Sequence, residues 1–313
     1  MLRLIANRLL VALPVMAVVV TIVFLLLRIS PGDPALIMAG DQATPEVLAS
    51  IRAEMGLDRP IPVQYLAWIG DLLQGDLGRS AISKTPVTRL IASRIEPTLV
   101  LALCALCLTV AIAVPLGTIA AWRQNTLVDR TIMGVTVAGL SVPAFVIAYL
   151  LILWFSLDLR LFPVQGYVSP FDDLPRAARH LVLPSVTLAL VYSALITRVT
   201  RASVLETLDE DFVRTARAKG GGEARILLRH VLPNAAVPII TVVGLSVAAL
   251  VTGVVVTESV FNIPGIGRLM VDSILSRDYP IVQGLMLVFA LLYVLVNLAV
   301  DVLYVVANPR IRY

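Results

Sequence analysis

Long apolar runs separated by polar segments are the feature that most limits how this chain can fold. Six of these runs approach or exceed the roughly 20 residues that a helix needs to cross a bilayer. Only 15% of the 313 residues are charged and 58% are hydrophobic, too few charges to cover a soluble fold of this size. The sequence therefore predicts an all-α integral membrane protein with six transmembrane helices, at residues 9–29, 99–122, 131–157, 181–196, 235–257 and 281–300. The fourth run is short, so we expect it to continue past Arg198, whose long side chain can reach the membrane surface.

Arginines near the ends of the runs predict the orientation of the helices. They gather near both termini, as Arg3 and Arg310, after the second run, as Arg123, and between residues 198 and 229. Because positive residues favour the cytoplasmic side, we expect both termini and the 198–229 stretch to be cytoplasmic. The same clustering accounts for the net charge of +4 without a nucleic acid partner.

Three regions follow from this topology. Residues 1–30 form the first transmembrane helix, which we expect to be retained because no Ala-x-Ala-like cleavage site follows it. Residues 31–95 form a small external, periplasmic lobe with short amphipathic helices at 45–55 and 63–73. Residues 96–313 form the core domain with helices 2–6, and a further short helix at 268–277 lies at the outer surface.

A polar segment at residues 203–233 interrupts the apolar pattern between the fourth and fifth runs. Asp209 is placed to cap a helix that has acidic residues in its first turn and basic residues in its last. Glycines at 220–222 end that helix, and a second run ends at Pro233, where the chain takes a new direction. The sequence predicts two short helices joined by a glycine hinge, and composition alone leaves a merely solvated loop as the alternative.

The chemistry-bearing residues do not form a catalytic or metal-binding pattern. His180 and His230 are the only histidines and fall on opposite sides of the predicted membrane. Cys104 and Cys107 share a face of an apolar run, where cysteine behaves as a small hydrophobic residue. Few ionisable residues lie within the runs, which disfavours a proton-coupled carrier. We expect no catalytic residue, no metal and no cofactor bound by this chain.

The positions of the lysines indicate whether a transporter of this sequence could bind ATP itself. A phosphate-binding P-loop needs Gly-x-x-x-x-Gly-Lys followed by Ser or Thr, and neither Lys84 nor Lys219, the two lysines of the chain, has that context. An ATP-driven transporter would therefore need a separate ATPase subunit, and the 203–233 segment is the place where it can bind. A self-sufficient secondary carrier or channel stays open as a different class of function.

The polar segment resembles the coupling segment of bacterial ABC importer permeases, whose pattern is Glu-Ala-Ala, three residues, Gly, nine residues and Ile-x-Leu-Pro. Aligned on Gly220, the triplet falls on Arg214-Thr215-Ala216 and the end on Leu232-Pro233, with His230 in place of Ile. The family usually has an apolar residue where this chain has Gly221. The sequence Arg-Thr-Ala-Arg-Ala-Lys-Gly is similar to that of the dipeptide, oligopeptide and nickel branch of the family. Further stretches resemble the first permease of that branch: Pro31-Gly32-Asp33-Pro34, Gly56-Leu57-Asp58-Arg59-Pro60, Gln64-Tyr65, Gly75-Asp76-Leu77-Gly78, Ser141-Val142-Pro143-Ala144-Phe145, Glu258 to Gly267, Arg277-Asp278-Tyr279-Pro280 and Pro309-Arg310.

The resemblance implies a multi-pass permease of the bacterial cytoplasmic (inner) membrane with type I ABC importer architecture. It implies peptides as cargo, with nickel or other metal chelates, glutathione and opines as alternatives. The implied partners are a second homologous permease, two cytoplasmic ATPases that bind ATP and Mg²⁺, an extracytoplasmic substrate-binding protein and the lipid bilayer.

The resemblance also assigns site residues. Phe212, Val213, Ala216 and Ile226 would make the apolar contact with an ATPase. The external lobe and residues 259–280 would receive the binding protein. The implied ATPase-coupling residues are Asp211, Phe212, Arg214, Thr215, Ala216, Arg217, Lys219, Gly220, Leu232 and Pro233. The implied external gate residues are Glu258, Phe261, Pro264, Gly265 and Gly267.

Overall fold

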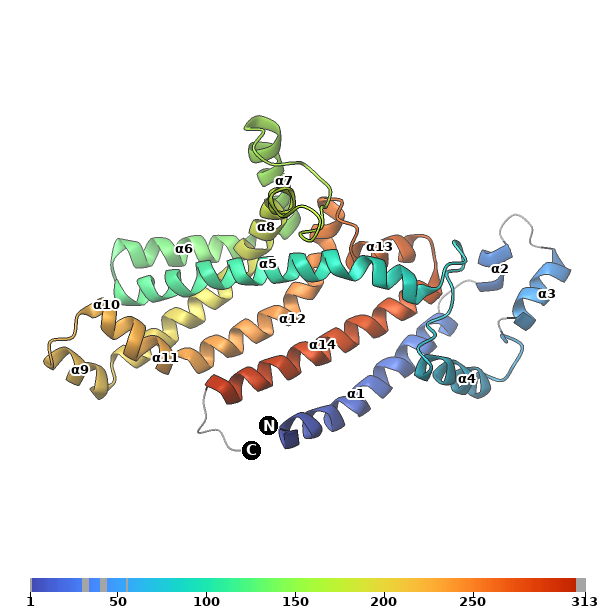
Figure 1. The fold of residues 1–313 in the computed structure, drawn as a ribbon, viewed down its shortest axis with the longest axis horizontal. Coiled ribbons are helices and arrows are strands. Elements are labelled where there is room, and N and C mark those ends of the chain that lie inside the picture. The colour runs from blue at the N-terminus through green and yellow to red at the C-terminus, as the bar shows by residue number, and fades with distance from the viewer. Residues whose placement is uncertain (1, 30–33, 40–43, 55, 308–313) are drawn as a thin grey trace. The chain divides into compact units, whose positions relative to one another are not determined.

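The computed structural model describes residues 2–29, 34–39, 44–54 and 56–307, and every regular element within them is a helix (Figure 1). One isolated bridge between Arg79 and Pro86 is the only extended pairing in these ranges. The all-α prediction is confirmed. The stretches Pro31-Gly32-Asp33 and Pro309-Arg310, which contribute to the family resemblance, lie outside the described residues. The elements are α1 (Leu2–Ile29), α2 (Pro34–Ala39), α3 (Pro45–Glu54), α4 (Ile61–Leu73), α5 (Val87–Trp122), α6 (Leu127–Ser141), α7 (Ala144–Leu151), the π-helix η2 (Ile152–Asp158), α8 (Leu174–Leu208), α9 (Asp211–Ala218), α10 (Glu223–Ile226), the π-helix η3 (Leu227–Val231), α11 (Leu232–Asn234), α12 (Ala236–Val260), α13 (Ile266–Leu275) and α14 (Tyr279–Ala307).

The long helices are suited to a membrane by length and by surface. Within the described residues, α5, α8, α12 and α14 are each long and apolar enough to cross a bilayer, and α6 with α7 and η2 makes a fifth crossing if that bent pair is one span. A shorter apolar stretch, Leu10–Leu25, lies in α1. Large side chains such as Leu103, Val135 and Leu245 are 62–68% exposed. Lipid would cover this apolar surface, which in water would drive aggregation.

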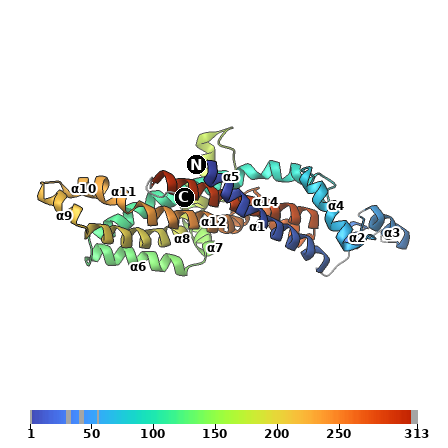
Figure 2. The same ribbon diagram turned by 90° about the horizontal axis from the view of Figure 1, so that it is seen from below.

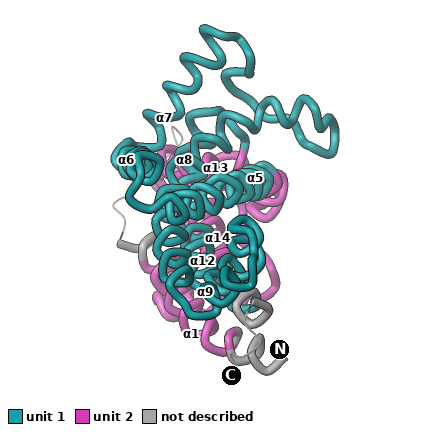
Figure 3. Tube along the Cα trace, turned by 90° about the vertical axis from the view of Figure 1, so that its left-hand side faces the viewer, with its two compact units in different colours: residues 1, 97–264, 295–313 teal, residues 2–96, 265–294 magenta. Residues whose placement is uncertain are grey.

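The chain divides into two compact units (Figure 3). Unit 1 holds residues 1, 97–264 and 295–313, and unit 2 holds residues 2–96 and 265–294. Both α5 and α14 therefore continue from one unit into the other along their own length.

Helix α8 is the centre of unit 1. In its most apolar 18-residue window 61% of the residues are buried, against 33% in α12, and it packs against α6, α7 and α12. Asp173 caps its start by accepting a 3.0 Å hydrogen bond from the Arg176 backbone N–H, satisfying one of the donors that a helix start leaves unpaired. Its continuation to Leu208 confirms that the fourth run extends beyond Arg198.

The transmembrane helix predicted over 131–157 is not continuous. Helix α6 ends at Ser141 and α7 begins at Ala144, and the two are bent by 104°. Pro143 is the cause. Val142 takes the extended conformation that is favoured before proline (φ −96°, ψ 124°), and Pro143 has no N–H with which to continue the helix.

Unit 2 packs α3 and α4 in one body with α1, α2, α13 and the adjoining ends of α5 and α14. The Phe24 ring of α1 lies edge-on to Tyr65 of α4, with 5.1 Å between ring centroids, and the Thr21 and Tyr65 hydroxyls are 2.7 Å apart. Helices α3, α4 and α13 confirm the short helices predicted at 45–55, 63–73 and 268–277. The apolar core contains Val87, Ile91, Ile266, Leu269, Ile281 and Leu285.

Candidate functional site

The polar segment predicted to couple the chain to a partner joins α8 to α12 through α9, α10, η3 and α11. In two views at right angles these short helices gather at one end of α8 and α12 (Figures 1 and 2). The predicted arrangement of helix, glycine hinge and helix is confirmed, because α9 ends at Ala218 and α10 begins at Glu223.

Asp209 does not cap α9, so that prediction is wrong. Helix α8 continues to Leu208. Asp209 is the C-cap residue of α8 and keeps a helical conformation (φ −84°, ψ −7°). Glu210 takes the extended conformation that precedes α9 (φ −70°, ψ 147°), without a capping bond from its side chain. A run of three acidic residues does not reveal which one begins a helix when the previous helix ends inside the same run.

The hinge is an ordered turn held by backbone hydrogen bonds. The Gly220 N–H donates to the Arg217 carbonyl (2.9 Å) and the Gly221 N–H donates to the Ala216 carbonyl (3.1 Å), the two bonds of a Schellman motif. Gly220 has φ +80°, a left-handed conformation that favours glycine. A Cβ on Gly221 would lie 3.0 Å from the Ala216 carbonyl oxygen, so a side chain here would require the turn to shift slightly.

On the solvent-exposed side of the hinge, an ion pair joins α9 to α10. Arg217 of α9 donates two hydrogen bonds to Glu223 of α10, Nε to Oε1 at 2.8 Å and an NH2 group to Oε2 at 3.2 Å. The hydrogen bond to Glu223 raises the pKa of Arg217 above its usual range. Both side chains are about two-fifths exposed, so solvent screens the pair and its value is geometric: it fixes the angle between α9 and α10.

The buried face of the segment packs on the helices that it connects. Val213 and Ile226 are fully buried, and Ala216 packs against the same core. The prediction that Val213 and Ile226 contact a partner is therefore wrong, since both contact this chain's own core. The cluster takes residues from α5, α8, α9, α10, η3 and α12: Ala121, Val204, Val213, Ile226, Leu227, Val231, Ala235 and Ile239.

The opposite face of α9 is exposed and mixes one aromatic ring with charge. Phe212 is 41% exposed, and Arg214 lies 3.4 Å from Asp211 in a pair that is almost fully in solvent. The Thr215 hydroxyl donates to the Asp211 carbonyl, and Lys219 is exposed at the end of the helix. An exposed aromatic ring among charged side chains is typical of a protein contact surface.

Pro233 does not turn the chain where the sequence predicted. It lies in α11, which follows η3 without interruption, and the helical path continues to Asn234 before it breaks at Ala235. The Asn234 side chain donates to the His230 carbonyl at 2.6 Å. Leu232 packs against the core of the segment and Pro233 is exposed.

The residues predicted to form the external gate have defined positions and contacts within their own units. Glu258 is fully buried, and the Thr98 hydroxyl donates to its carboxylate at 2.5 Å. The carbonyl of the buried Phe261 accepts from the Gly166 N–H at 2.9 Å, and Pro264 is exposed. In unit 2, Gly265 precedes the first turn of α13 and Gly267 is buried in it.

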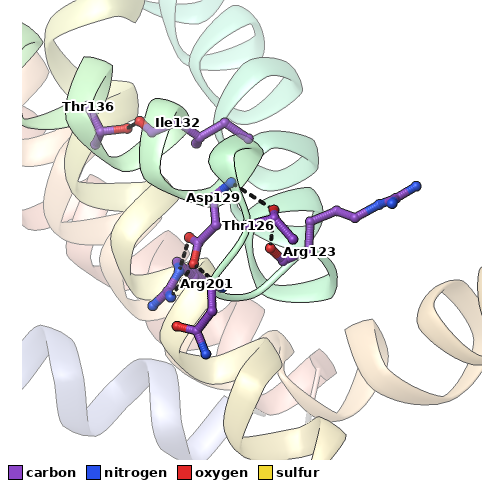
Figure 4. Close-up of polar contacts among 7 residues, drawn as sticks. Arg123, Thr126, Asp129, Ile132, Thr136 and Arg201 are labelled. Carbon is purple, nitrogen blue, oxygen red and sulfur yellow. Dashed lines mark hydrogen bonds and ion pairs between the residues drawn. The ribbon is translucent and has the colours of Figure 1, made fainter.

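Two further long-range contacts were not predicted. Asp129 of α6 and Arg201 of α8 form a two-pronged ion pair (Figure 4), and in unit 2 Asp278 accepts a hydrogen bond from Ser80. The spacing Thr126-x-x-Asp129 is a helix-start signal that would have placed Asp129. No local pattern shows its partner 72 residues away. Among the described residues, no group of three or more His, Cys, Asp or Glu side chains is arranged to hold a metal ion.

Comparisons with known proteins cover the whole chain. Residues 113–313 match the family of binding-protein-dependent transport system inner membrane components, and residues 1–102 match the N-terminal region described for such membrane components. The chain is 48% identical to a probable peptide ABC transporter permease protein of Sinorhizobium fredii, over 99% of both chains. It is 44% identical to a putative peptide transport system permease protein of Brucella abortus and 43% identical to the glutathione transport system permease protein GsiC of Salmonella choleraesuis, over the full length of each.

Solved structures show the same fold. The inward-facing MetNI methionine ABC transporter resembles this chain with a TM-score of 0.59 at 15% identity, over 70% of this chain and 96% of that one. At this identity the likeness concerns the fold alone, which is that of an ABC importer permease.

Proposed function

The chain belongs to the family of binding-protein-dependent transport system inner membrane components, and from this premise we propose that it is the permease subunit of an ATP-driven peptide importer. It is a multi-pass protein of the bacterial inner membrane. The observation that carries the proposal is the two-faced α9, which buries Val213 in this chain's core and leaves Phe212 and Arg214 exposed for a partner.

In the proposed topology the chain crosses the membrane six times, with both termini in the cytoplasm and residues 31–95 outside. The count is supported by the four long apolar helices, the bent pair of α6 and α7 with η2, and the apolar stretch Leu10–Leu25 of α1. With 28 residues, α1 is about 42 Å long, enough to cross the hydrocarbon core.

The energy comes from partner subunits in this proposal. The sequence has no P-loop, so two cytoplasmic ATPases would bind ATP and Mg²⁺ and grip α9, while a second, homologous permease completes the pore. Displacement of α9–α11 would move α8 and α12, because these short helices share one apolar core with α8 and α12. This chain itself would be non-catalytic, and an extracytoplasmic binding protein would deliver the cargo.

Peptides are the proposed cargo because the Sinorhizobium and Brucella relatives are described as peptide permeases. Glutathione is the second candidate, since the permease from Salmonella is described as a glutathione permease and is nearly as similar. Both are peptide-like molecules, and the choice between them rests on the binding protein.

The test compares two neighbouring residues on opposite faces of α9, in the chain assembled with its partners in proteoliposomes. Phe212→Asp should leave insertion and thermal stability unchanged and abolish ATP-driven uptake of dialanine, trialanine and glutathione. Phe212→Tyr should retain uptake, whereas Val213→Asp places a charge in the core and should lower thermal stability. Undiminished uptake by Phe212→Asp would refute the coupling role. Uptake by the purified chain alone, without an ATPase, would support the self-sufficient carrier instead.

A further inference from the structure

The start of α6 is joined to α8 by an ion pair in which the carboxylate is buried (Figure 4). The Nε of Arg201 donates to one carboxylate oxygen of Asp129 at 2.6 Å, and an NH2 group of Arg201 donates to the other at 2.7 Å. The Asp129 side chain is 5% exposed and that of Arg201 24%. A planar guanidinium that meets a carboxylate with two parallel bonds fixes both distance and orientation.

The Asp129 carboxylate is also held within its own turn. It accepts a 3.0 Å hydrogen bond from the Asn125 N–H, while the Asp129 N–H donates to the Thr126 hydroxyl. Opening the ion pair would leave a buried charge without its counter-charge, which is strongly unfavourable. The geometry therefore favours a link that stays closed through a working cycle.

The position of Arg201 makes this link relevant to movement. It lies two turns before the end of α8 at Leu208, next to the part of α8 that packs on α9 and α10 through Val204. The apolar core of the coupling segment takes residues from α5, α8 and α12 and none from α6. Helix α6 also packs along α8, but in lipid apolar helix packing has no hydrophobic driving force to hold one register.

We propose that the Asp129–Arg201 pair makes α6 move with α8 as one body when the coupling segment is displaced, which rests on the proposed coupling function. Asp129 and Arg201 are positioning residues, since they act on the pore through the helices that they join. Helix α6 leads into the 104° bend and α7, so the pair extends the displacement to the bent helix pair.

The first experiment does not depend on transport. Amide hydrogen exchange in residues 127–134 of the purified chain should be about 10- to 100-fold faster in Arg201→Gln, the effect of losing hydrogen bonds to a charged group. The matched control is Arg198→Gln, an exposed arginine one turn earlier on α8, which should leave this exchange unchanged. Equal exchange in both variants would refute the link. Where Gln disrupts insertion, Arg201→Lys keeps the charge and removes the fork.

The second experiment uses the assembled importer in proteoliposomes and counts trialanine taken up per ATP hydrolysed. Arg201→Gln should lower this ratio about 5- to 100-fold at normal assembly, the usual range of coupling between linked sites. With Cys104 and Cys107 replaced by Ser, a bismaleimide bridge between Asp129→Cys and Arg201→Cys should restore the ratio. A bridged complex that hydrolyses ATP without uptake would refute movement as one body. A wild-type complex without ATP-driven uptake would refute the proposed function, and the exchange experiment would still decide whether the link exists.

Discussion

The hydroxyl of Ser80 donates a 2.5 Å hydrogen bond to the carboxylate of Asp278, a residue 198 positions further along the chain. The same carboxylate accepts from the backbone N–H groups of Ala81 (3.1 Å) and Ile82 (3.4 Å), and it is 2% exposed. One buried carboxylate thus organises the turn that begins at Ser80, within unit 2.

Replacement of Asp278 by Ala should therefore loosen this turn. We expect a loss of about 2–3 kcal/mol in unfolding free energy, because a charged acceptor is lost and the buried Ser80 hydroxyl loses its partner. Trypsin should cut faster after Lys84, which is exposed in the same turn. Asp272→Ala, an exposed carboxylate on α13, is the control and should change neither the melting temperature nor the digestion rate. Equal digestion of the two variants would contradict the anchoring role.

A second prediction concerns Thr98 and the buried carboxylate of Glu258. Thr98→Val keeps the shape of the side chain and removes the donor at 2.5 Å, so it should destabilise the chain by about 1.5–3 kcal/mol. Thr98→Ser keeps a hydroxyl and should recover most of the loss. The measurement is thermal unfolding in detergent, and a Val variant as stable as the Ser variant would show that this hydrogen bond contributes nothing.

The local features of this fold were predictable and the long-range ones were not. Each apolar run became helical, and Gly220 ended α9, because length and left-handed backbone are readable from neighbouring residues. Pro143 is a local signal for the bend, but the apolar residues on both sides of it predict one continuous span. The burial of Val213 depends on residues of α5, α8 and α12, and the partner of Asp129 lies on another helix. Such contacts exist only after the helices pack.

The three hinge glycines should respond differently to alanine. Gly220→Ala places a Cβ in the left-handed region and should cost about 1–2 kcal/mol. Gly221→Ala puts a Cβ 3.0 Å from the Ala216 carbonyl oxygen and 3.3 Å from Ile226, which should cost about 1–3 kcal/mol. Gly222 has an ordinary φ of −66°, and a Cβ there would meet nothing within 4 Å, so Gly222→Ala should stay within about 0.5 kcal/mol of wild type. Unfolding midpoints rank the three variants, and a Gly222 variant as unstable as the others would contradict the structure of the hinge.

The last prediction concerns the close approach of α8 and α12. The Tyr192 hydroxyl donates to the Ala249 carbonyl at 2.7 Å, and a Cβ on Gly253 would lie 3.0 Å from Cε2 and 3.2 Å from Cζ of the Tyr192 ring. Gly253→Ala should therefore destabilise the chain by about 1–3 kcal/mol through overpacking. Tyr192→Phe should cost about 0.6 kcal/mol, the average for a hydrogen bond between membrane helices.

The double variant distinguishes overpacking from a general effect of alanine in α12. Tyr192→Phe removes the hydroxyl oxygen, which is the atom nearest to the new methyl group. Tyr192→Phe with Gly253→Ala should therefore be more stable than the sum of the single changes predicts, by about 1 kcal/mol. Gly134→Ala in α6 is the control: a Cβ there meets nothing within 4 Å, and alanine should stabilise the helix by about 0.8–1 kcal/mol. Unfolding free energies of the four variants in one detergent make the comparison. Strict additivity of the double variant would show that Gly253 is not required by the Tyr192 ring.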